Sequence, residues 1–287
     1  MKKGLLEEIG IMLLREGFTV KTLTRTCFDV VARRGSQIIL IKVLEDANSI
    51  TEEYAEQMKR ISSYISASPV VLAEKAGNKL EDNVVYSRFG VFTLNKSTFQ
   101  NCLANKMPFV MSTKAGLTAA VAGEKLKEKI EEQGYSLGAI SRRIGVSKRM
   151  VMRYEEGSDI SVNKARVLHN IFGPVVFRKI DIFSEGKPEP QKSGSSIVKK
   201  YGTLGFEAAE TKKAPFDIVA KKEREIIFTE IGDKANPHLQ PLTQMINADN
   251  LVIFKKKKPK HLPALTKKEF MEFESANELI KFLKEFE

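Results

Sequence analysis

The feature that most constrains this chain is an internal repeat. When residues 17–43 are laid without a gap on residues 205–231, 8 of the 27 positions are identical, whereas unrelated segments would share about two. The identities include a Gly-Phe pair and a Phe-Asp pair, the latter at Phe28-Asp29 and Phe216-Asp217. Hydrophobic strands alone could produce a false repeat, but they do not require a matched glycine or aspartate. We therefore expect two related domains.

Each copy of the repeat has the pattern of a small mixed α/β domain. β-branched and apolar residues dominate 18–31 and 37–44, and Arg33 to Ser36 indicate a turn between them, so the segment predicts a hairpin. Other elements of the first copy are expected at 4–16 (helix), 51–65 (helix), 70–72 (buried strand), 84–94 (strand) and 97–104 (helix). We expect one α/β domain over residues 1–105 and a related one over residues 197–287.

A helical region separates the two copies. Residues 122–133 predict one helix, and Ser161 caps a later helix that Gly173-Pro174 ends. We expect an all-α module over residues 113–173. The stretch after it, 183–196, is rich in Pro, Gly and Ser and poor in apolar residues, which is typical of a linker.

Residues 135–157, YSLGAISRRIGVSKRMVMRYEEG, predict two short helices joined by a tight turn. The expected buried positions recur at helical spacing: Ile140, Ile144, Val151 and Tyr154. Gly145 tolerates the positive φ that ends the first helix, and Ser147 supplies a side-chain oxygen that caps the second.

The outward face of the second helix is basic, with Lys148, Arg149 and Arg153 between its buried positions. A short helix with an apolar back and a cationic front suits the DNA major groove, because Lys and Arg reach phosphate oxygens and the edge of guanine. A solvated helix face is the alternative without function. The turn glycine, the serine cap and the basic face occur in register, which favours DNA binding.

This stretch resembles the Cro/lambda-repressor type of helix-turn-helix. The matching residues are Ser136, Ile140-Ser141, Gly145-Val146-Ser147 and Glu155-Glu156-Gly157. The resemblance implies that Lys148, Arg149 and Arg153 contact bases in double-stranded DNA, while Ser147 and nearby backbone amides hold phosphates. The family often has Gln near the start of the first helix, where this chain has Leu137. The whole chain looks like archaeal transcriptional regulators with a central helix-turn-helix of this type.

The flanking domains resemble the PD-(D/E)XK restriction-endonuclease-like fold, closest to archaeal Holliday-junction resolvases. The resemblance rests on Gly-Phe followed by Phe-Asp, a turn and an apolar strand. In that family an Asp and a Glu about thirteen residues later bind a divalent metal, and a Lys two further on helps activate water.

Both copies depart from that catalytic pattern. The first keeps Asp29 but has Lys42 at the Glu position, which predicts an ion pair instead of a metal site. The second keeps Asp217 and Glu230, with Gly232 at the Lys position and Lys234 nearby. We therefore expect no catalytic residue, no metal and no cofactor. The vestigial nuclease positions are Asp29, Lys42, Asp217 and Glu230.

Charge and cysteine content narrow the class of protein further. The chain has 47 Lys and Arg against 36 Asp and Glu, a net charge of +11, which favours a polyanionic partner. Its two cysteines are far apart and suggest neither a disulfide framework nor a zinc site. We find neither a signal-peptide pattern nor an apolar run of about 18 residues, so we expect a soluble cytoplasmic protein without membrane contact.

These observations favour a sequence-specific DNA-binding transcriptional regulator, not an enzyme, that acts as a homodimer. The first alternative is a metal-dependent, structure-selective DNA nuclease that uses the helix-turn-helix for targeting. The second is a scaffold whose helix-turn-helix binds protein. Mg²⁺-dependent cleavage of DNA distinguishes the first alternative, and the salt dependence of duplex binding distinguishes the second.

Overall fold

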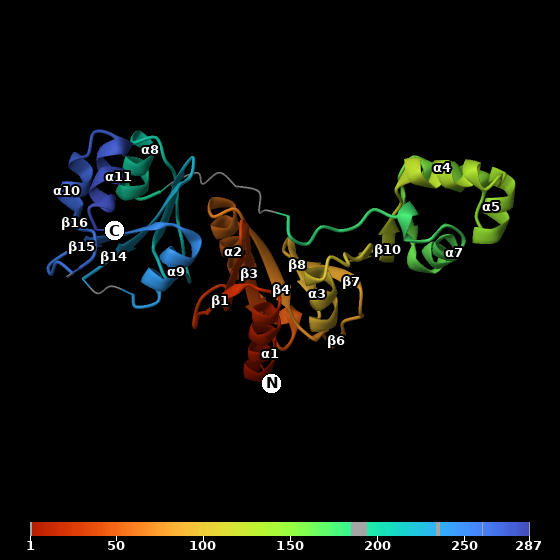
Figure 1. Cartoon of the computed structure of the whole chain (residues 1–287), viewed down its shortest axis with the longest axis horizontal. Helices are drawn as coiled ribbons and strands as arrows, with labels where there is room; N and C mark the ends of the chain where they lie inside the picture. The colour runs from red at the N-terminus through yellow and green to blue at the C-terminus, as the bar shows by residue number, and fades with distance from the viewer. Residues whose placement is uncertain (1, 185–193, 234–235, 260, 287) are drawn as a thin grey trace. The chain divides into compact units, whose positions relative to one another are not determined.

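A computed structural model describes residues 2–184, 194–233, 236–259 and 261–286 (Figure 1). The chain divides into two compact units. Unit 1 comprises Met1–Val71, Phe89–Val91 and Phe183–Glu287, and unit 2 comprises Leu72–Arg88 and Phe92–Ile182. Most of the expected linker, 185–193, lies outside the described residues, and its last residue, Ser196, already begins a helix. No helix among the described residues is long and apolar enough to cross a membrane.

The first copy of the repeat, up to residue 71, forms one half of unit 1 and is red to orange in Figure 1. Most of the rest of the domain expected over residues 1–105 belongs to unit 2. Its elements are α1 (Lys2–Arg15), β1 (Thr19–Thr22), β2 (Val30–Arg34), β3 (Gln37–Val43), α2 (Glu52–Tyr64) and β4 (Ala67–Leu72), with the strands in the order β1-β2-β3-β4. The expected strand over 18–31 is two strands. The chain turns at Arg25, whose φ is +60°. The amide of Leu23 donates to the carbonyl of Asp29 across this turn, and the amide of Cys27 donates to the carbonyl of Lys213.

The second copy repeats this arrangement strand for strand. Its elements are α8 (Ser196–Thr203), β12 (Glu207–Glu210), β13 (Ile218–Lys222), β14 (Glu225–Ile231), α9 (Leu239–Ile246), β15 (Asp249–Phe254), β16 (Ala264–Thr266), α10 (Lys267–Glu272) and α11 (Ala276–Lys284). The strand order is β12-β13-β14-β15-β16, antiparallel as far as β14 and parallel from there.

In the sequence, each residue of the first copy aligns with the residue 188 positions later in the second. The same offset relates the residue pairs of their strands. Thr19 pairs with Arg33 in the first copy, and Glu207 pairs with Lys221 in the second. The left-handed turn at Arg25 recurs at Lys213, where φ is +55°. The repeat is therefore a repeat of backbone structure as well as of sequence.

The two copies bury equivalent apolar surfaces in one shared cluster. Its buried members come in matched pairs: Phe28 and Phe216, Val31 and Val219, Met58 and Leu239, Ile61 and Leu242, Ile65 and Ile246. The guanidinium of Arg33 donates to the carbonyl of Met245 at 2.7 Å, and the ammonium of its equivalent, Lys221, donates to the hydroxyl of Ser66 at 3.1 Å. Each cation thus binds near the carboxyl end of the other copy's helix, α9 or α2, where the helix dipole favours positive charge. Equivalent faces meet here as they do across a two-fold dimer, but within one chain.

Unit 2 begins with short strands and a helix. These elements are β5 (Lys75–Ala76), β6 (Asn78–Lys79), β7 (Val84–Arg88), β8 (Val91–Leu94) and α3 (Lys96–Leu103). The expected strand over 84–94 is divided into β7 and β8 by a turn at Phe89 and Gly90, both of which have positive φ.

The helical part of unit 2 is not all-α, contrary to expectation. Its elements are β9 (Val110–Thr113), β10 (Gly116–Ala120), α4 (Gly123–Glu132), α5 (Leu137–Ile144), α6 (Lys148–Glu155), β11 (Asp159–Ser161) and α7 (Val162–Phe172). β10 pairs with β9 and β11, and Ala119 and Ile160 from these strands share one core with the four helices. A three-residue strand such as β11 is too short to show an alternating pattern in the sequence.

Candidate nucleic-acid interface

The helices α5 and α6 and the turn between them follow the sequence closely. The hydroxyl of Ser136 accepts from the amide of Ala139 at the start of α5, and the hydroxyl of Ser147 accepts from the amide of Met150 at the start of α6. Gly145 ends α5 with φ 70° and ψ 47°, the left-handed conformation that glycine adopts without strain. The two helices are therefore fixed by local signals at both of their facing ends.

The apolar side of this pair is buried and its basic side is exposed. The four expected core residues are at most 4% exposed: Ile140, Ile144, Val151 and Tyr154. Lys148, Arg149 and Arg153 are exposed, and none of them makes a hydrogen bond or ion pair within the described residues. Met152 lies on the same outer face and is 49% exposed. The face predicted from sequence to meet DNA is thus free to bind a ligand.

The first two residues of α5 have different surroundings: Gly138 lies beside Lys148 of the basic face, and Leu137 packs against the core. A side chain at Gly138 would place its Cβ 3.1 Å from Cε of Lys148, so the missing side chain leaves room for the lysine stem over α5. Leu137 is half-buried against the core, which gives it a packing role at the position where the family often has a Gln that reaches DNA.

Sequence reasoning missed Lys164 on α7. Its ammonium donates to the carbonyl of Ile144 at 3.0 Å and to that of Gly145 at 2.7 Å, which satisfies acceptors left open at the carboxyl end of α5. No local spacing reveals this contact, because Lys164 is separated from Gly145 by 19 residues.

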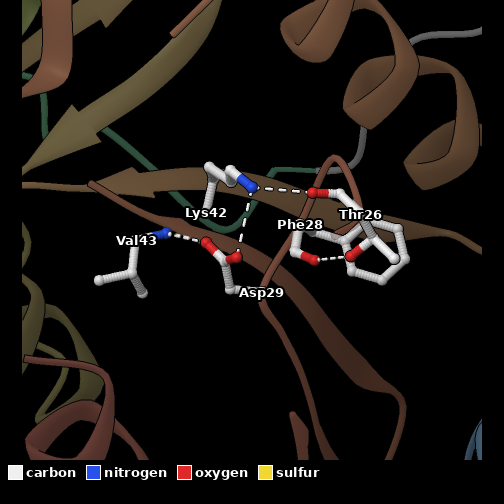
Figure 2. Close-up of polar contacts among 5 residues, drawn as sticks. All are labelled: Thr26, Phe28, Asp29, Lys42 and Val43. Carbon is white, nitrogen blue, oxygen red and sulfur yellow. Dashed lines mark hydrogen bonds and ion pairs between the residues drawn. The ribbon is translucent and has the colours of Figure 1, made fainter. Parts of the chain in front are cut away.

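In the first α/β copy, Asp29 and Lys42 form the expected ion pair (Figure 2). The Lys42 ammonium lies 3.3 Å from Asp29 Oδ1 and donates to the carbonyl of Thr26 at 2.8 Å. Asp29 Oδ2 accepts from the amide of Val43 at 2.9 Å, and both charged side chains are buried. The ammonium also lies 5.0 Å from the centre of the Tyr54 ring.

In the second copy the equivalent carboxylates are arranged differently. Asp217 Oδ2 accepts from the amide of Ile231, as Asp29 does from Val43. Glu230 is 6% exposed, and its Oε2 accepts from the amide of Asn236. Its Oε1 is buried and has no hydrogen-bond partner among the residues that the structure describes. Burial raises the pKa of Glu230 to about 7, although the hydrogen bond from the amide of Asn236 opposes the shift.

These arrangements decide how each copy suits the divalent metal of PD-(D/E)XK nucleases. In the first copy Lys42 supplies a positive charge beside Asp29, so the residues do not fit a metal ion. In the second copy the carboxylates of Asp217 and Glu230, the latter with one unpartnered oxygen, suit a cation, which would there polarise a phosphate oxygen and activate water. Within the described ranges no group of three or more His, Cys, Asp or Glu residues is placed so that it could hold a metal ion, and Lys234 lies outside these ranges.

Comparisons with known proteins agree with the helix-turn-helix resemblance and with the nuclease-like resemblance of the first α/β copy. Residues 2–109 match the PD-(D/E)XK superfamily domain. An Archaeoglobus fulgidus protein named "Putative HTH-type transcriptional regulatory protein" is 30% identical over 305 residues, which cover 99% of this chain and 98% of the relative. The chain belongs to this family. Proteins with the same name from Pyrococcus furiosus (30% identical, 90% and 89% covered) and Methanosarcina acetivorans (29%, 99% and 97%) are similar along nearly their whole length.

The similarity to this family extends over nearly the whole chain and does not by itself assign a reaction or a ligand. The names of these relatives describe regulators and not enzymes, while the PD-(D/E)XK match is to a superfamily that includes nucleases. No solved structure matches the chain. The assignment of individual residues therefore rests on the geometry described above.

Proposed function

We propose that this protein is a sequence-specific transcriptional regulator that binds double-stranded DNA through a Cro-type helix-turn-helix formed by α5 and α6. In this proposal residues 113–173 are the DNA-binding module, and residues 1–105 and 197–287 are nuclease-like domains that do not cleave DNA. Asp29, Lys42, Asp217 and Glu230 are then remnants of the nuclease site.

The observation that carries the proposal is the exposed basic face of α6. Arg149 and Arg153 have no partner within the described residues, so their planar guanidinium groups are available to bind guanine O6 and N7 together. Lys148 supplies a further charge at the start of the helix. Ser147 and the open amides of the first turn of α6 suit a phosphate oxygen, because a helix amino end attracts anions.

We further propose that the protein binds as a homodimer. Helix-turn-helix dimers contact two half-sites about 34 Å apart, and the two-fold symmetry of the protein is then matched by a palindromic site. The α/β copies remain the candidates for self-association or for sensing an effector. A strictly monomeric protein on an asymmetric site at micromolar concentration would contradict this part of the proposal.

The test is the substitution Arg149→Ala, measured on a selected target duplex and on random duplex. Loss of a base contact should weaken target binding by about 1 to 3 kcal/mol and leave random duplex nearly unchanged. Arg166→Ala, an exposed arginine on α7, is the matched control. Equal loss on both duplexes would show that Arg149 meets only phosphate. Duplex binding that does not fall with salt would favour the protein-binding scaffold.

The second candidate function is metal-dependent cleavage of DNA. It is supported by the superfamily match and by the unpartnered oxygen of Glu230. It is opposed by Gly232, which occupies the position of the nuclease lysine. Incubation of linear and branched DNA with Mg²⁺ or Mn²⁺ should yield no products; products that disappear in Glu230→Gln would establish the nuclease.

A further inference from the structure

A loop of four consecutive lysines, Lys255–Lys258, follows β15 in the second copy. The equivalent residues after β4 in the first copy are Glu74, Lys75, Ala76 and Gly77, when the copies are aligned on the left-handed residues Ser66 and Asn247. Since the same strand occurs without the lysines in the first copy, the fold does not require them.

The lysine loop is held by Asp233, which follows the neighbouring strand β14. Asp233 Oδ1 accepts from three successive amides, those of Lys255 at 2.7 Å, Lys256 at 2.8 Å and Lys257 at 3.3 Å. These hydrogen bonds lower the pKa of Asp233 and keep it ionised. Successive amides that converge on one anion fix the backbone of the loop, although its side chains carry like charges.

The side chains of the lysine loop are available to a ligand. All four are exposed, and none makes a hydrogen bond or ion pair within the described residues. Residues 197–287 contain 17 lysines and arginines, and five of these lie between 255 and 260. These residues form the densest run of basic charge in this copy, which favours a polyanionic partner.

We propose that the lysine loop is a second DNA contact, which binds the phosphodiester backbone of duplex DNA without reading its sequence. The choice of DNA as the polyanion rests on the proposed function. Lysine suits this role because its compact charge on a flexible stem binds single phosphate oxygens, which position a protein but carry no base information. The helix α6 would then select the site, and the lysine loop would add affinity on every duplex.

The test replaces all four lysines with glutamine, K255Q/K256Q/K257Q/K258Q, in the full chain. A matched control, K199Q/K267Q/K268Q/K281Q, removes the same charge from exposed lysines elsewhere in the second copy. Each phosphate contact contributes roughly 0.9 to the slope of log affinity against log salt, so two to four lost contacts should lower the slope by about 2 to 4. At 0.1 M salt the affinity should fall about tenfold or more, equally on target and random duplex.

The fold of the loop is checked separately. Glutamine keeps the backbone amides, so hydrogen exchange at positions 255–257 should stay as slow as in the unchanged protein. If hydrogen exchange is faster in the fourfold variant, the double variants K255Q/K257Q and K256Q/K258Q are used instead. Each should give about half of the change in the slope of log affinity against log salt.

The outcomes separate this proposal from the proposed function. If the loop variant has the same salt slope as the control variant, or if it loses only binding to vesicles that contain phosphatidylserine, the loop is not a DNA contact. Arg149→Ala, measured in parallel, should lose sequence preference. Its slope of log affinity against log salt should still contain the contribution of the lysine loop. If Arg149→Ala leaves sequence preference intact while the loop variant lowers the slope, the loop proposal holds and the proposed mode of recognition fails.

Discussion

At the scale of single residues, the two copies place different groups beside their equivalent aspartates, Asp29 and Asp217. Lys42 places an ammonium beside Asp29, so the buried carboxylate of the first copy is neutralised by the chain itself. Among the described residues no such cation pairs with Glu230 in the second copy, and one of its oxygens is buried without a partner there. Its charged form is therefore disfavoured in the folded protein. The sequence predicts the ion pair between Asp29 and Lys42, because Lys42 occupies the position at which the nuclease pattern has a Glu close to the Asp.

Glu230 should make the folded protein less stable as the pH rises. Its folded pKa of about 7 lies above its ordinary value of 4.5, so the penalty is absent below the ordinary pKa and complete above the folded one. Glu230→Gln should therefore raise the free energy of unfolding by about 2 to 3 kcal/mol more at pH 8 than at pH 4.5. Chemical denaturation at both pH values measures this difference, with the exposed Glu272→Gln as control. A gain in the free energy of unfolding that is the same at both pH values would contradict the raised pKa of Glu230.

At the scale of elements, the sequence predicts those helices whose signals are local. Gly145 and Ser147 fix the two ends of the α5–α6 turn within three residues, and the structure confirms both. The strands β9, β10 and β11 were not expected, because segments of three to five residues carry too little periodicity. Contacts between distant segments, such as that of Lys164 with α5, leave no local pattern at all.

Gly123, the first residue of α4, lies very close to the end of α6, the helix that carries the exposed basic face. A Cβ at this position would lie 2.0 Å from the carbonyl oxygen of Glu155 at the end of α6, and the contact is with backbone. Gly123→Ala should therefore push α4 and α6 apart and destabilise unit 2 by about 1 to 3 kcal/mol. Thermal unfolding measures this loss. Gly10→Ala on α1, where a Cβ meets nothing within 4 Å, should be neutral or slightly stabilising. Equal stability of both variants would contradict the close approach.

At the scale of the whole molecule, the repeat provides an internal two-fold arrangement. The face that includes α2 and α9 is buried between the two copies in one chain, so it is not available to a second chain in this arrangement. A homodimer must then use another surface. The sequence predicts two related domains, but it does not predict that they pack against each other, since most residues of that face are the apolar residues that any core would contain.

The packing of the copies can be tested by cutting the chain between them. A protease site inserted within residues 185–193 would separate the second copy, and the two pieces should still co-elute in gel filtration at micromolar concentration. Arg33→Ala with Lys221→Ala removes one charged hydrogen bond from each side of the interface and should weaken the association by about 1.5 to 3 kcal/mol per bond. Pieces that separate at once after cleavage would contradict the shared core.

The most direct measurement for the central claim is the selection of bound sequences from a pool of random DNA duplexes. Recognition by the exposed face of α6 predicts an enriched palindrome with half-sites about 10 base pairs apart, and its loss in Arg149→Ala. A pool that stays random, or an enrichment that Arg149→Ala leaves unchanged, would contradict that claim.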